Sequence, residues 1–502
     1  MSAAATVVDE WLAEQRRLTP IERFSAKHDA GTVPAQARYY QELIPAARPG
    51  PGQQYRFEID LDACTGCKSC VVACNSLNGL DEDESWRSVG LLHGTAPGVR
   101  YQQTVTTGCH HCVDPACLAG CPVDAYEKDP ETGIVRHLDD QCIGCSYCTL
   151  TCPYEVPTYS KSRGIVRKCD MCHDRLAEGE APACVQACPN GAIRIGIVDT
   201  VVLAAAAATG SALVPGAPPS SMTVPSTEYR SARGQLDDVL AADRFAVKPA
   251  HAHNPLTVML VLTQLSVGAF VVDLLVPGSS RWGSAIALLT GLLALGASVL
   301  HLGRPQYAWR AVIGLRHSWL SREVVAFGAF AAAAVPYALL QVEALGYAVA
   351  ATGLAGVACS VQLYARTRRR WWRASSTTIR FGLSTAVSGL ALVLLTSGER
   401  SLAWILMGAT VVKLLWELSV LRHRGRGDGD LAKTAQLLLG DLRGQLLARL
   451  GLGVAGGVVV PLLVLAGLPL AAAGVVLVVG AELVERRLFF TAVAAPRMPG
   501  LV

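Results

Sequence analysis

Sixteen of the seventeen cysteines in this 502-residue chain lie between positions 64 and 188 and form four blocks of four. In each block the last two cysteines are four positions apart, and a proline follows the fourth cysteine in the second, third and fourth blocks. Three thiolates at close spacing can wrap one cube of iron and sulfide, while the fourth points away and closes a cube held by another block. The four blocks therefore predict four [4Fe-4S] clusters.

Two other uses of cysteine fit this pattern less well. Disulfide-rich scaffolds are small and secreted, whereas this chain is long and strongly apolar, and we expect no cleavable signal sequence in it. Structural zinc sites use two cysteine pairs that are separated by a longer insert. Three cysteines within seven residues, as in the first and third blocks, favour a cube of iron and sulfide.

The sequence between the blocks indicates which blocks share clusters. Residues 126–137 contain two strand-like runs around a turn at 129–133, which predicts a hairpin that joins blocks two and three. Strand-like runs at 55–59 and 192–195 can pair and close an outer unit around this inner one. The predicted ligand sets are Cys64, Cys67, Cys70 with Cys188; Cys169, Cys172, Cys184 with Cys74; Cys109, Cys112, Cys117 with Cys152; and Cys142, Cys145, Cys148 with Cys121.

Composition divides the chain into a mixed first part and an apolar second part. The hydrophobic fraction is 51% and the mean hydropathy +0.34, which is too apolar for an ordinary soluble protein. The net charge of +4 is modest, so nucleic-acid binding is not indicated. We expect an α+β fold class, a double two-cluster ferredoxin-like domain followed by an all-α membrane bundle. The predicted regions are an N-terminal arm that lies on a partner subunit (1–53), the cluster domain (54–199), a linker (200–252), the membrane anchor (253–492) and a C-terminal tail (493–502).

Eight stretches of the second part are long and apolar enough to cross a lipid bilayer. The last two are separated by only three residues, and Pro469 favours two helices over one long one. The predicted spans are 255–276, 282–302, 320–341, 344–365, 378–397, 401–420, 446–467 and 469–489.

Positive charge marks one end of these spans. The loops after the even-numbered spans carry nineteen lysines and arginines, and the opposite loops carry only Arg281 and Arg400. Positive loops stay in the cytoplasm, so we expect the cluster domain on the cytoplasmic side of the inner membrane. The alternative is that these arginines bind a partner or quinone headgroups on either side.

The polar residues of the spans indicate what the membrane part binds. Intramembrane haem needs pairs of histidines, and only His301 falls within a predicted span, so we expect no haem. A membrane quinone is the remaining partner for one-electron clusters. His301 could hydrogen-bond a quinone carbonyl, Arg304 lies beside it, and Glu323 or Glu482 could relay protons. The alternatives are that His301 caps its helix and that Glu323 pairs with its neighbour.

Three further groups have simpler interpretations. Lys413 and Glu417 lie four residues apart on one helix, where they can pair with each other. His110 and His111 are not needed as metal ligands, since no cysteine is missing from their block. Cys359, alone in a span, is expected to be a small buried hydrophobic residue.

Residues 64–189 resemble the four-cluster electron-transfer subunit of dimethyl-sulfoxide-reductase-type molybdoenzymes. The membrane part resembles the anchor subunit of the same enzymes, in the wider polysulfide-reductase-anchor family. The phrases that carry the second resemblance are His301-Leu-Gly-Arg-Pro305, Ala308-Trp-Arg310, Ser318-Trp-Leu-Ser-Arg-Glu323 and Glu482-Leu-Val-Glu-Arg-Arg-Leu-Phe-Phe490. The resemblance implies a separate catalytic subunit with a molybdopterin guanine dinucleotide cofactor, and a quinol site at His301 and Glu323.

Two departures from that family affect the expected reaction. The two subunits are fused in one chain, and the charge pattern places the clusters inside the cell. An inward-facing relative is similar to quinone-linked sulfite-oxidising enzymes, so we expect electrons to pass from a substrate such as sulfite to quinone. The alternative is a menaquinol-oxidising S- or N-oxide reductase. An ion-translocating subunit is disfavoured, because no ionisable residue beyond Lys413 is expected at mid-membrane depth.

Overall fold

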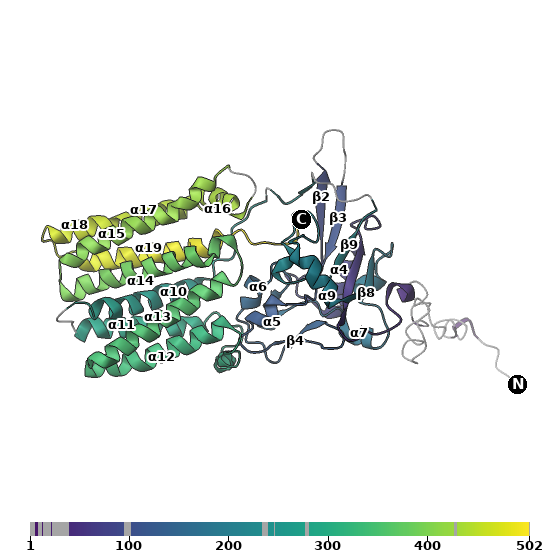
Figure 1. Ribbon diagram of the computed structural model, residues 1–502, viewed down its shortest axis with the longest axis horizontal. Helices are drawn as coiled ribbons and strands as arrows, with labels where there is room; N and C mark the ends of the chain where they lie inside the picture. Colours follow the sequence, from purple (N-terminus) through teal and green to yellow (C-terminus); the bar gives the residue numbers. More distant parts are fainter. Residues whose placement is uncertain are drawn as a thin grey trace.

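Two parts are stacked end to end in the computed structural model (Figure 1). The cysteine-bearing domain, with its strands and short helices, lies at one end, and a bundle of long helices forms the other. The structure describes residues 6–8, 13, 22, 40–94, 102–232, 239–244, 246–276, 281–425 and 429–500. Most of the predicted N-terminal arm therefore lies outside the described residues, and Tyr40, at its end, is buried.

The cysteine-bearing domain is built on two three-stranded sheets and two hairpins. Strand β1 (Gln53–Asp60) pairs antiparallel with β8 (Ile193–Asp199) and parallel with β9 (Glu228–Arg230). The second sheet has the order β10 (Val239–Ala241), β2 (Ser88–Gly94), β3 (Gln102–Thr107). The hairpins are β4 (Tyr126–Lys128) with β5 (Val135–His137) and β6 (Thr158–Ser160) with β7 (Ile165–Arg167). The predicted outer pairing and inner hairpin are both confirmed.

Alternation of apolar residues explains why β1 lies at the centre of its sheet. Tyr55, Phe57 and Ile59 are buried, and residues between them point to the other face, as a period of two requires. Five short helices follow or contain the cysteines and complete the domain. They are α4 (Ser69–Asn78), α5 (Ala116–Gly120), α6 (Tyr147–Thr151), α7 (His173–Ala177) and α8 (Ala183–Gln186).

Two segments outside residues 54–199 also pack on this domain. Part of the predicted linker forms α9 (Thr200–Ala208), the short helix η2 (Ser220–Met222), and strands β9 and β10. The C-terminal tail returns from the bundle: the Leu91 N–H donates to the Gly500 carbonyl at 2.8 Å, and the Gly500 N–H donates to Asp243 Oδ1 at 2.6 Å. Arg497 forms an ion pair with Asp243 at 2.6 Å. Both ends of the membrane anchor are therefore tied to the cluster domain.

Seven helices of the bundle are long and apolar enough to cross a membrane, among the residues that the structure describes. The first six are α10 (Asn254–Asp273), α11 (Arg281–Val299), α12 (Trp319–Leu340), α13 (Glu343–Ala365), α14 (Ala374–Ser397) and α15 (Ser401–Leu418). The seventh runs from α17 (Arg443–Val454) through the π-helix η6 (Ala455–Val459) into α18 (Val460–Leu465). The eighth predicted span coincides with α19 (Ala471–Thr491), which carries four charged residues near its end, so a crossing there stays a prediction.

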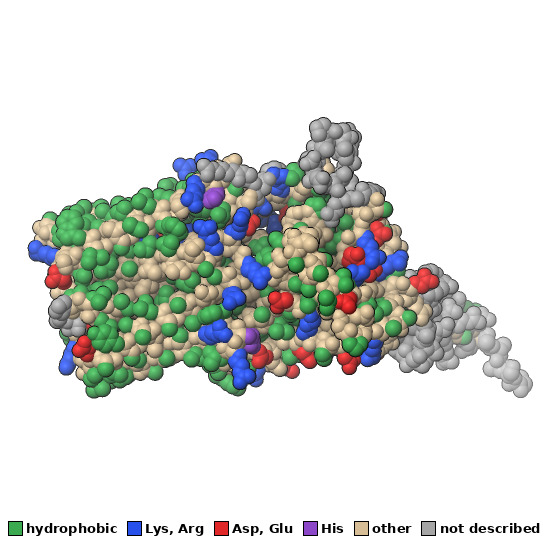
Figure 2. Space-filling model, viewed as in Figure 1, with side chains coloured by type: hydrophobic (Ala, Val, Ile, Leu, Met, Phe, Trp, Pro, Cys, Tyr) green, Lys and Arg blue, Asp and Glu red, His purple; other side chains and the backbone are tan. Residues whose placement is uncertain are grey.

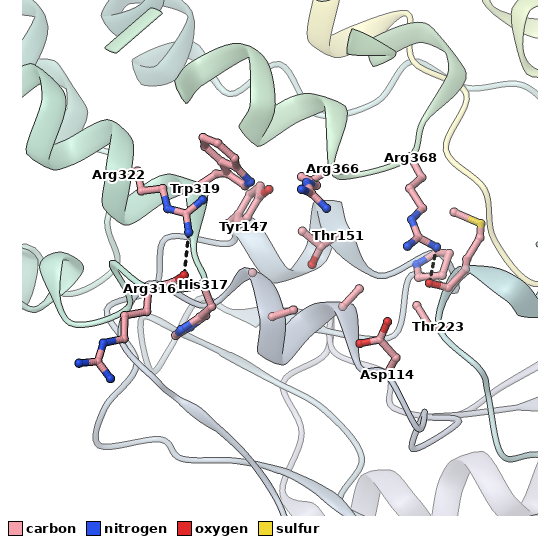
Figure 3. A pocket seen from close by; sticks show the side chains of 15 residues that line it. Asp114, Tyr147, Thr151, Thr223, Arg316, His317, Trp319, Arg322, Arg366 and Arg368 are labelled. Carbon is pink, nitrogen blue, oxygen red and sulfur yellow. Dashed lines mark hydrogen bonds between the residues drawn. The ribbon is translucent and has the colours of Figure 1, made fainter. Parts of the chain in front are cut away.

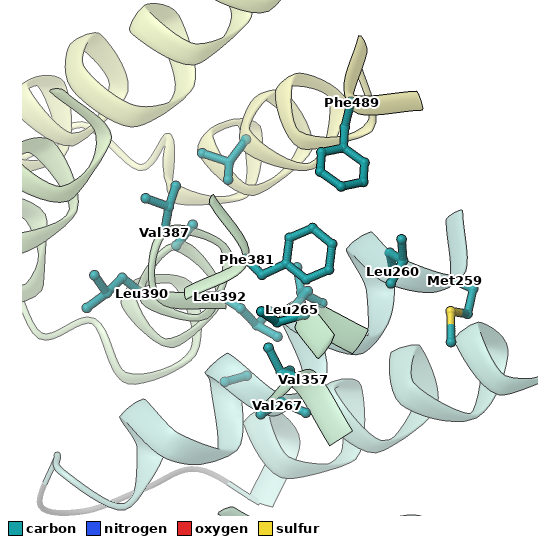
Figure 4. Close-up of a cluster of buried hydrophobic side chains, with 14 of the residues drawn as sticks. Met259, Leu260, Leu265, Val267, Val357, Phe381, Val387, Leu390, Leu392 and Phe489 are labelled. Carbon is teal, nitrogen blue, oxygen red and sulfur yellow. The ribbon is translucent and has the colours of Figure 1, made fainter. Parts of the chain in front are cut away.

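Helices α10 and α14 form the centre of the bundle. Gly268 of α10 and Gly389 of α14 let their backbones touch, since a Cβ added at Gly268 would lie 1.9 Å from the Thr385 carbonyl oxygen. Around this contact pack Leu265, Phe381 and Phe489, contributed by α10, α14 and α19 (Figure 4). The outer surface of the bundle is apolar, and lysines and arginines gather where it meets the cluster domain (Figure 2). This pattern fits a bundle surrounded by lipid.

Candidate functional site

Cysteines of different blocks lie near one another in the folded domain. Cys121 and Cys142 lie within electrostatic reach of Cys145 and Cys148. The same relation joins Cys152 to the first three cysteines of block two, and Cys74 to the first three of block four. Cys188 is brought toward block one by the pairing of β1 with β8, and Asn190 Nδ2 donates to Thr65 Oγ1 at 3.2 Å. The ligand sets themselves stay a prediction.

The surroundings of the thiols fit thiolate ligands of an iron-sulfur cluster. All sixteen are free of disulfides. Backbone N–H groups point at the sulfurs: Ala125 donates to Cys121 Sγ at 3.3 Å and Gly144 donates to Cys142 Sγ at 3.4 Å. Such hydrogen bonds stabilise sulfur that carries negative charge. Burial raises the pKa of Cys121 to about 11, so this free thiol is protonated at neutral pH and metal binding releases its proton.

Two buried cations lie among the cysteines. Arg87 is surrounded by cysteines of the outer unit, and their charges raise the pKa of its guanidinium. Lys168 lies near Cys109, Cys117 and Cys169, which raise the pKa of its ammonium group against the effect of burial. A buried cation needs a compensating anion. Both side chains therefore match a domain whose interior is negatively charged when thiolates are present.

The two histidines of the second block, His110 and His111, each use one ring nitrogen in a hydrogen bond. His110 Nδ1 lies 2.9 Å from Thr227 Oγ1, and His111 Nδ1 accepts from the Val135 N–H at 3.1 Å. Among the described residues, no three His, Cys, Asp or Glu side chains are close enough to hold one metal ion. Sixteen free thiols in blocks of four favour iron-sulfur clusters over single zinc ions.

The His301-Leu-Gly-Arg-Pro305 phrase binds the third cysteine block to the membrane anchor. The Arg304 N–H donates to the Ile143 carbonyl at 3.1 Å, and Arg304 Nη1 donates to the Asp139 carbonyl at 2.8 Å. Gly303 touches the backbone of Gly164: a Cβ at position 303 would lie 2.0 Å from the Gly164 carbonyl oxygen. Only glycine allows this approach. Arg304, predicted as a quinone ligand, is placed instead at this contact between the domains.

A second phrase makes a similar contact with the second block. The Gly314 N–H donates to the Pro122 carbonyl at 2.9 Å, and His317 Nε2 lies 2.9 Å from the Cys121 carbonyl oxygen. Ser318 Oγ donates to the Gly120 carbonyl at 2.8 Å. The two phrases together hold the set of Cys142, Cys145, Cys148 and Cys121 against the membrane helices.

Directly beneath this set lies a cavity of about 280 Å³. Its walls are mainly apolar, with leucines, Met259 and Phe327 from the helices, and the cluster domain contributes Cys145 and Tyr147. Mostly apolar cavities with a few convergent polar groups are typical of small-molecule sites. The convergent polar groups are His301 and Glu323, so the structure brings together two of the four predicted quinone residues.

The two polar groups have unused hydrogen-bonding capacity. His301, which follows the end of α11, has a buried Nδ1 with no hydrogen-bond partner in the part of the protein that the structure describes. Burial lowers the pKa of His301 below its ordinary value, so the imidazole is neutral at pH 7. Glu323 is 4% exposed, and Ser360 Oγ donates to its Oε1. Both side chains can therefore bind a polar headgroup in the cavity.

Glu482 lies elsewhere, in a network of buried charges between α14, α15, α17 and α19. Lys413 Nζ donates to Glu482, and Arg449 contacts Glu482 at 3.1 Å and Glu417 at 2.9 Å. The predicted pairing of Lys413 with Glu417 is confirmed at 3.7 Å. Arg380 and Arg486 each contact Glu485 at 3.4 Å. Lys413 therefore has two carboxylate partners, and the other buried charges of this network come from separate helices.

Sequence reasoning missed Tyr147, Ser360 and Tyr364. Tyr147 stands inside the third cysteine block, where its O–H donates to the Leu363 carbonyl at 2.6 Å. Tyr364, at the end of α13, also lines the cavity. Their signal was weak: each is one polar residue beside a strong motif or at the end of an apolar span.

Comparison with known families matches both parts of the protein. A family described as "4Fe-4S dicluster domain" matches residues 101–198, and "4Fe-4S binding domain" matches 55–76. "DMSO reductase anchor subunit (DmsC)" matches residues 250–422. The B subunit of the anaerobic dimethyl sulfoxide reductase of Escherichia coli (strain K12) is 42% identical over 154 residues, which cover 29% of this protein and 75% of the relative. The protein belongs to the family of dimethyl sulfoxide reductase B subunits.

Two further relatives are similar to the iron-sulfur part of this protein. The B subunit of the anaerobic dimethyl sulfoxide reductase of Haemophilus influenzae is 35% identical over 182 residues, covering 34% of this protein and 87% of the relative. The iron-sulfur subunit of the nitrate-inducible formate dehydrogenase of Escherichia coli (strain K12) is 36% identical over 182 residues, covering 33% and 58%. In this member of the B-subunit family, the iron-sulfur part and a membrane anchor of the dimethyl sulfoxide reductase type are fused in one polypeptide.

Proposed function

We propose that this protein passes electrons between a separate molybdopterin-containing catalytic subunit and a membrane quinone. Four [4Fe-4S] clusters, when bound, supply one-electron carriers between the two partners. The proposal is carried by one observation: Cys145, a predicted cluster ligand, lines the same cavity as His301 and Glu323. A quinone in that cavity lies next to a cluster ligand set, without intervening protein layers.

The cavity residues account for the needs of a quinone, which exchanges two electrons and two protons. His301 Nδ1 offers the hydrogen-bonding position for one carbonyl oxygen of the ring. Glu323 exchanges protons with the ring oxygen and is oriented by Ser360. Phe327, Met259 and the surrounding leucines exclude water and hold the apolar ring.

An exposed face of the cluster domain at α4 is the proposed contact with the catalytic subunit. Helix α4 presents Val72 and Leu77 there, which are 64% and 49% exposed. Cys67, a predicted ligand in block one, is also exposed. An exposed ligand beside apolar side chains is suited to electron transfer across a subunit interface.

We also propose that α19 crosses the membrane as an eighth span, with the cluster domain on the cytoplasmic side. Its charged residues Glu482, Glu485 and Arg486 are buried inside the bundle, so they need not face lipid. The cluster of arginines at the junction supports the cytoplasmic orientation. In intact cells, Arg370→Cys should escape an impermeant thiol reagent and Glu399→Cys, at the opposite end of the bundle, should react. The reverse labelling would overturn this orientation.

Two substrate reactions are compatible with this electron path. Cytoplasmic oxidation of a substrate such as sulfite, with reduction of quinone, is favoured by the arginine distribution. Menaquinol-driven reduction of an S- or N-oxide is favoured by identity to dimethyl sulfoxide reductase B subunits. The redox potentials of the purified complex discriminate between them, since clusters above the potential of the quinone pool cannot reduce it efficiently.

The quinone assignment is tested by rapid mixing of the chemically reduced complex with a soluble quinone. His301→Gln and Glu323→Gln should each slow reoxidation by about 100-fold or more, a typical loss for a missing proton-transfer group. Electron paramagnetic resonance should show unchanged clusters in both variants. Glu343→Gln, an exposed carboxylate at the other end of the bundle, is the matched control. Reoxidation at the wild-type rate in both cavity variants would refute the site.

A further inference from the structure

A second cavity, of about 350 Å³, lies at the junction of the two domains. It is enclosed by α5 and α6 of the cluster domain and by the ends of α12 and α13 (Figure 3). Nothing in the proposed electron path uses it. Its lining includes four arginines, and Asp114 is the sole carboxylate among the lining residues. The arginines are Arg316, Arg322, Arg366 and Arg368.

The charges of these arginines are not balanced within the described residues. Arg322 and Arg368 are held in place by backbone carbonyls: Arg322 Nη2 donates to the Arg316 oxygen at 2.7 Å, and Arg368 Nη1 donates to the Ser221 oxygen at 3.4 Å. Arg366 stands between them, near Thr151 (Figure 3). No carboxylate lies within 4.0 Å of any of the four guanidinium groups in the described part of the protein. Guanidinium groups that have no carboxylate partner can bind a phosphate by paired hydrogen bonds.

The position of the cavity selects the kind of phosphate. Helix α12 begins at Trp319 and α13 ends at Ala365, so the cavity lies where the apolar part of the bundle starts. Trp319, over which the Arg322 guanidinium stacks at 4.5 Å, lines it. Exposed apolar side chains follow the cavity residues in the sequence, including Val325, which is one turn from Arg322 on α12 and 41% exposed. A ligand here meets cations at one end and a lipid-facing surface at the other.

We propose that this cavity binds the phosphate headgroup of an anionic phospholipid such as phosphatidylglycerol. The acyl chains lie along the exposed apolar side chains of α12, and the four arginines hold the headgroup. Free phosphate would leave that apolar surface unused. The inference goes beyond the proposed electron path and requires only that the bundle lies in a membrane.

Tyr147 connects this cavity to the one that contains His301 and Glu323. It lines both, and its O–H is fixed by the Leu363 carbonyl at 2.6 Å. The lipid headgroup therefore packs against one wall of the proposed quinone cavity. Its acyl chains cover the bundle beside α12, which also supplies Glu323.

The test measures lipid binding to the complete complex in detergent by native mass spectrometry. The probes are phosphatidylglycerol and phosphatidylcholine with the same acyl chains, and inorganic phosphate. We expect wild type to prefer phosphatidylglycerol, and Arg316→Gln/Arg366→Gln to weaken its binding roughly 100-fold, since each of the two lost charge-assisted contacts is worth about tenfold. Arg373→Gln/Arg424→Gln removes two exposed arginines outside the cavity and should bind as wild type does.

Three outcomes would overturn the proposal. The first is equal wild-type affinity for the two lipids, a result that does not depend on any variant folding. The second is full retention of the phosphatidylglycerol preference in the cavity variant. The third is displacement of the lipid by inorganic phosphate at equal concentration, which would assign the cavity to a free anion. Quinone reoxidation rates are measured separately, so failure here leaves the electron path untouched.

Discussion

Replacing Glu482 with glutamine should destabilise the bundle more than any other conservative change in its buried charge network. The network contains four cations and three carboxylates, all nearly inaccessible to solvent. They are Arg380, Lys413, Arg449, Arg486, Glu417, Glu482 and Glu485. Glu482→Gln removes one carboxylate, so the formal charge of the network rises from +1 to +2. Lys413 would then keep only Glu417, at 3.7 Å, as an ionic partner.

The size of the effect follows from the cost of leaving a buried charge unpaired. Breaking a buried pair by removing one partner typically costs about 3–5 kcal/mol. For a bundle of about 250 residues, that corresponds to a fall in Tm of roughly 6–20 °C. Lys413→Met should cost less, because Glu482 keeps Arg449 at 3.1 Å and accepts from Ser384 Oγ at 2.6 Å. The double variant should be more stable than the sum of the two effects implies, by about 1–3 kcal/mol.

Thermal unfolding of the full-length protein in detergent, followed by the helical circular dichroism signal, measures these differences. Glu343→Gln is the control, since its carboxylate is exposed and accepts from the likewise exposed Tyr347 Oη at 3.1 Å; a change in the free energy of unfolding within about 0.5 kcal/mol is expected. A fall in Tm of less than about 2 °C for Glu482→Gln, or simple additivity in the double variant, would refute the reasoning about uncompensated charge.

Three other predictions address the clusters, the junction and the cavity. Cys74→Ala should remove the electron paramagnetic resonance signal of the fourth-block cluster, and loss of the first-block signal would contradict the nested ligand sets. Gly303→Ala should lower the free energy of unfolding by about 1–3 kcal/mol and slow quinone reoxidation. Gly408→Ala, whose added methyl meets open space, should change neither quantity. Because burial lowers the pKa of His301, the ratio of wild-type to His301→Gln reoxidation rates should stay constant between about pH 6.5 and 8; an inflection near the ordinary histidine pKa of about 6.5 in that ratio would contradict a neutral imidazole.

The sequence predicted those elements whose signal is local. Cysteine spacing indicated the cluster domain, the turn at 129–133 indicated the β4–β5 hairpin, and apolar runs placed the membrane helices to within a few residues. His301 and Glu323 could be singled out because an ionisable residue in an apolar span is unusual.

The parts that could not be predicted depend on contacts between distant segments. Strands β9 and β10 are three residues long and lie in a stretch rich in proline and serine, so only their partners in the sheets define them. Arg304 was placed in the quinone site because of its position beside His301, but its side chain reaches the Asp139 carbonyl across the junction. Glu482 required the positions of four helices before its partners could be known.

The hydrogen bond from the Leu91 N–H to the Gly500 carbonyl has a consequence for the biosynthesis of the protein. Synthesis runs from the N-terminus, so Arg497 and Gly500 leave the ribosome after α19 and the helices before it have been made. Until then, the backbone of Leu91 lacks its final hydrogen bond, and Asp243 lacks both Arg497 and the Gly500 N–H. The cluster domain therefore completes its packing only after the membrane helices have been made, and a polypeptide truncated before Arg497 would lack these contacts.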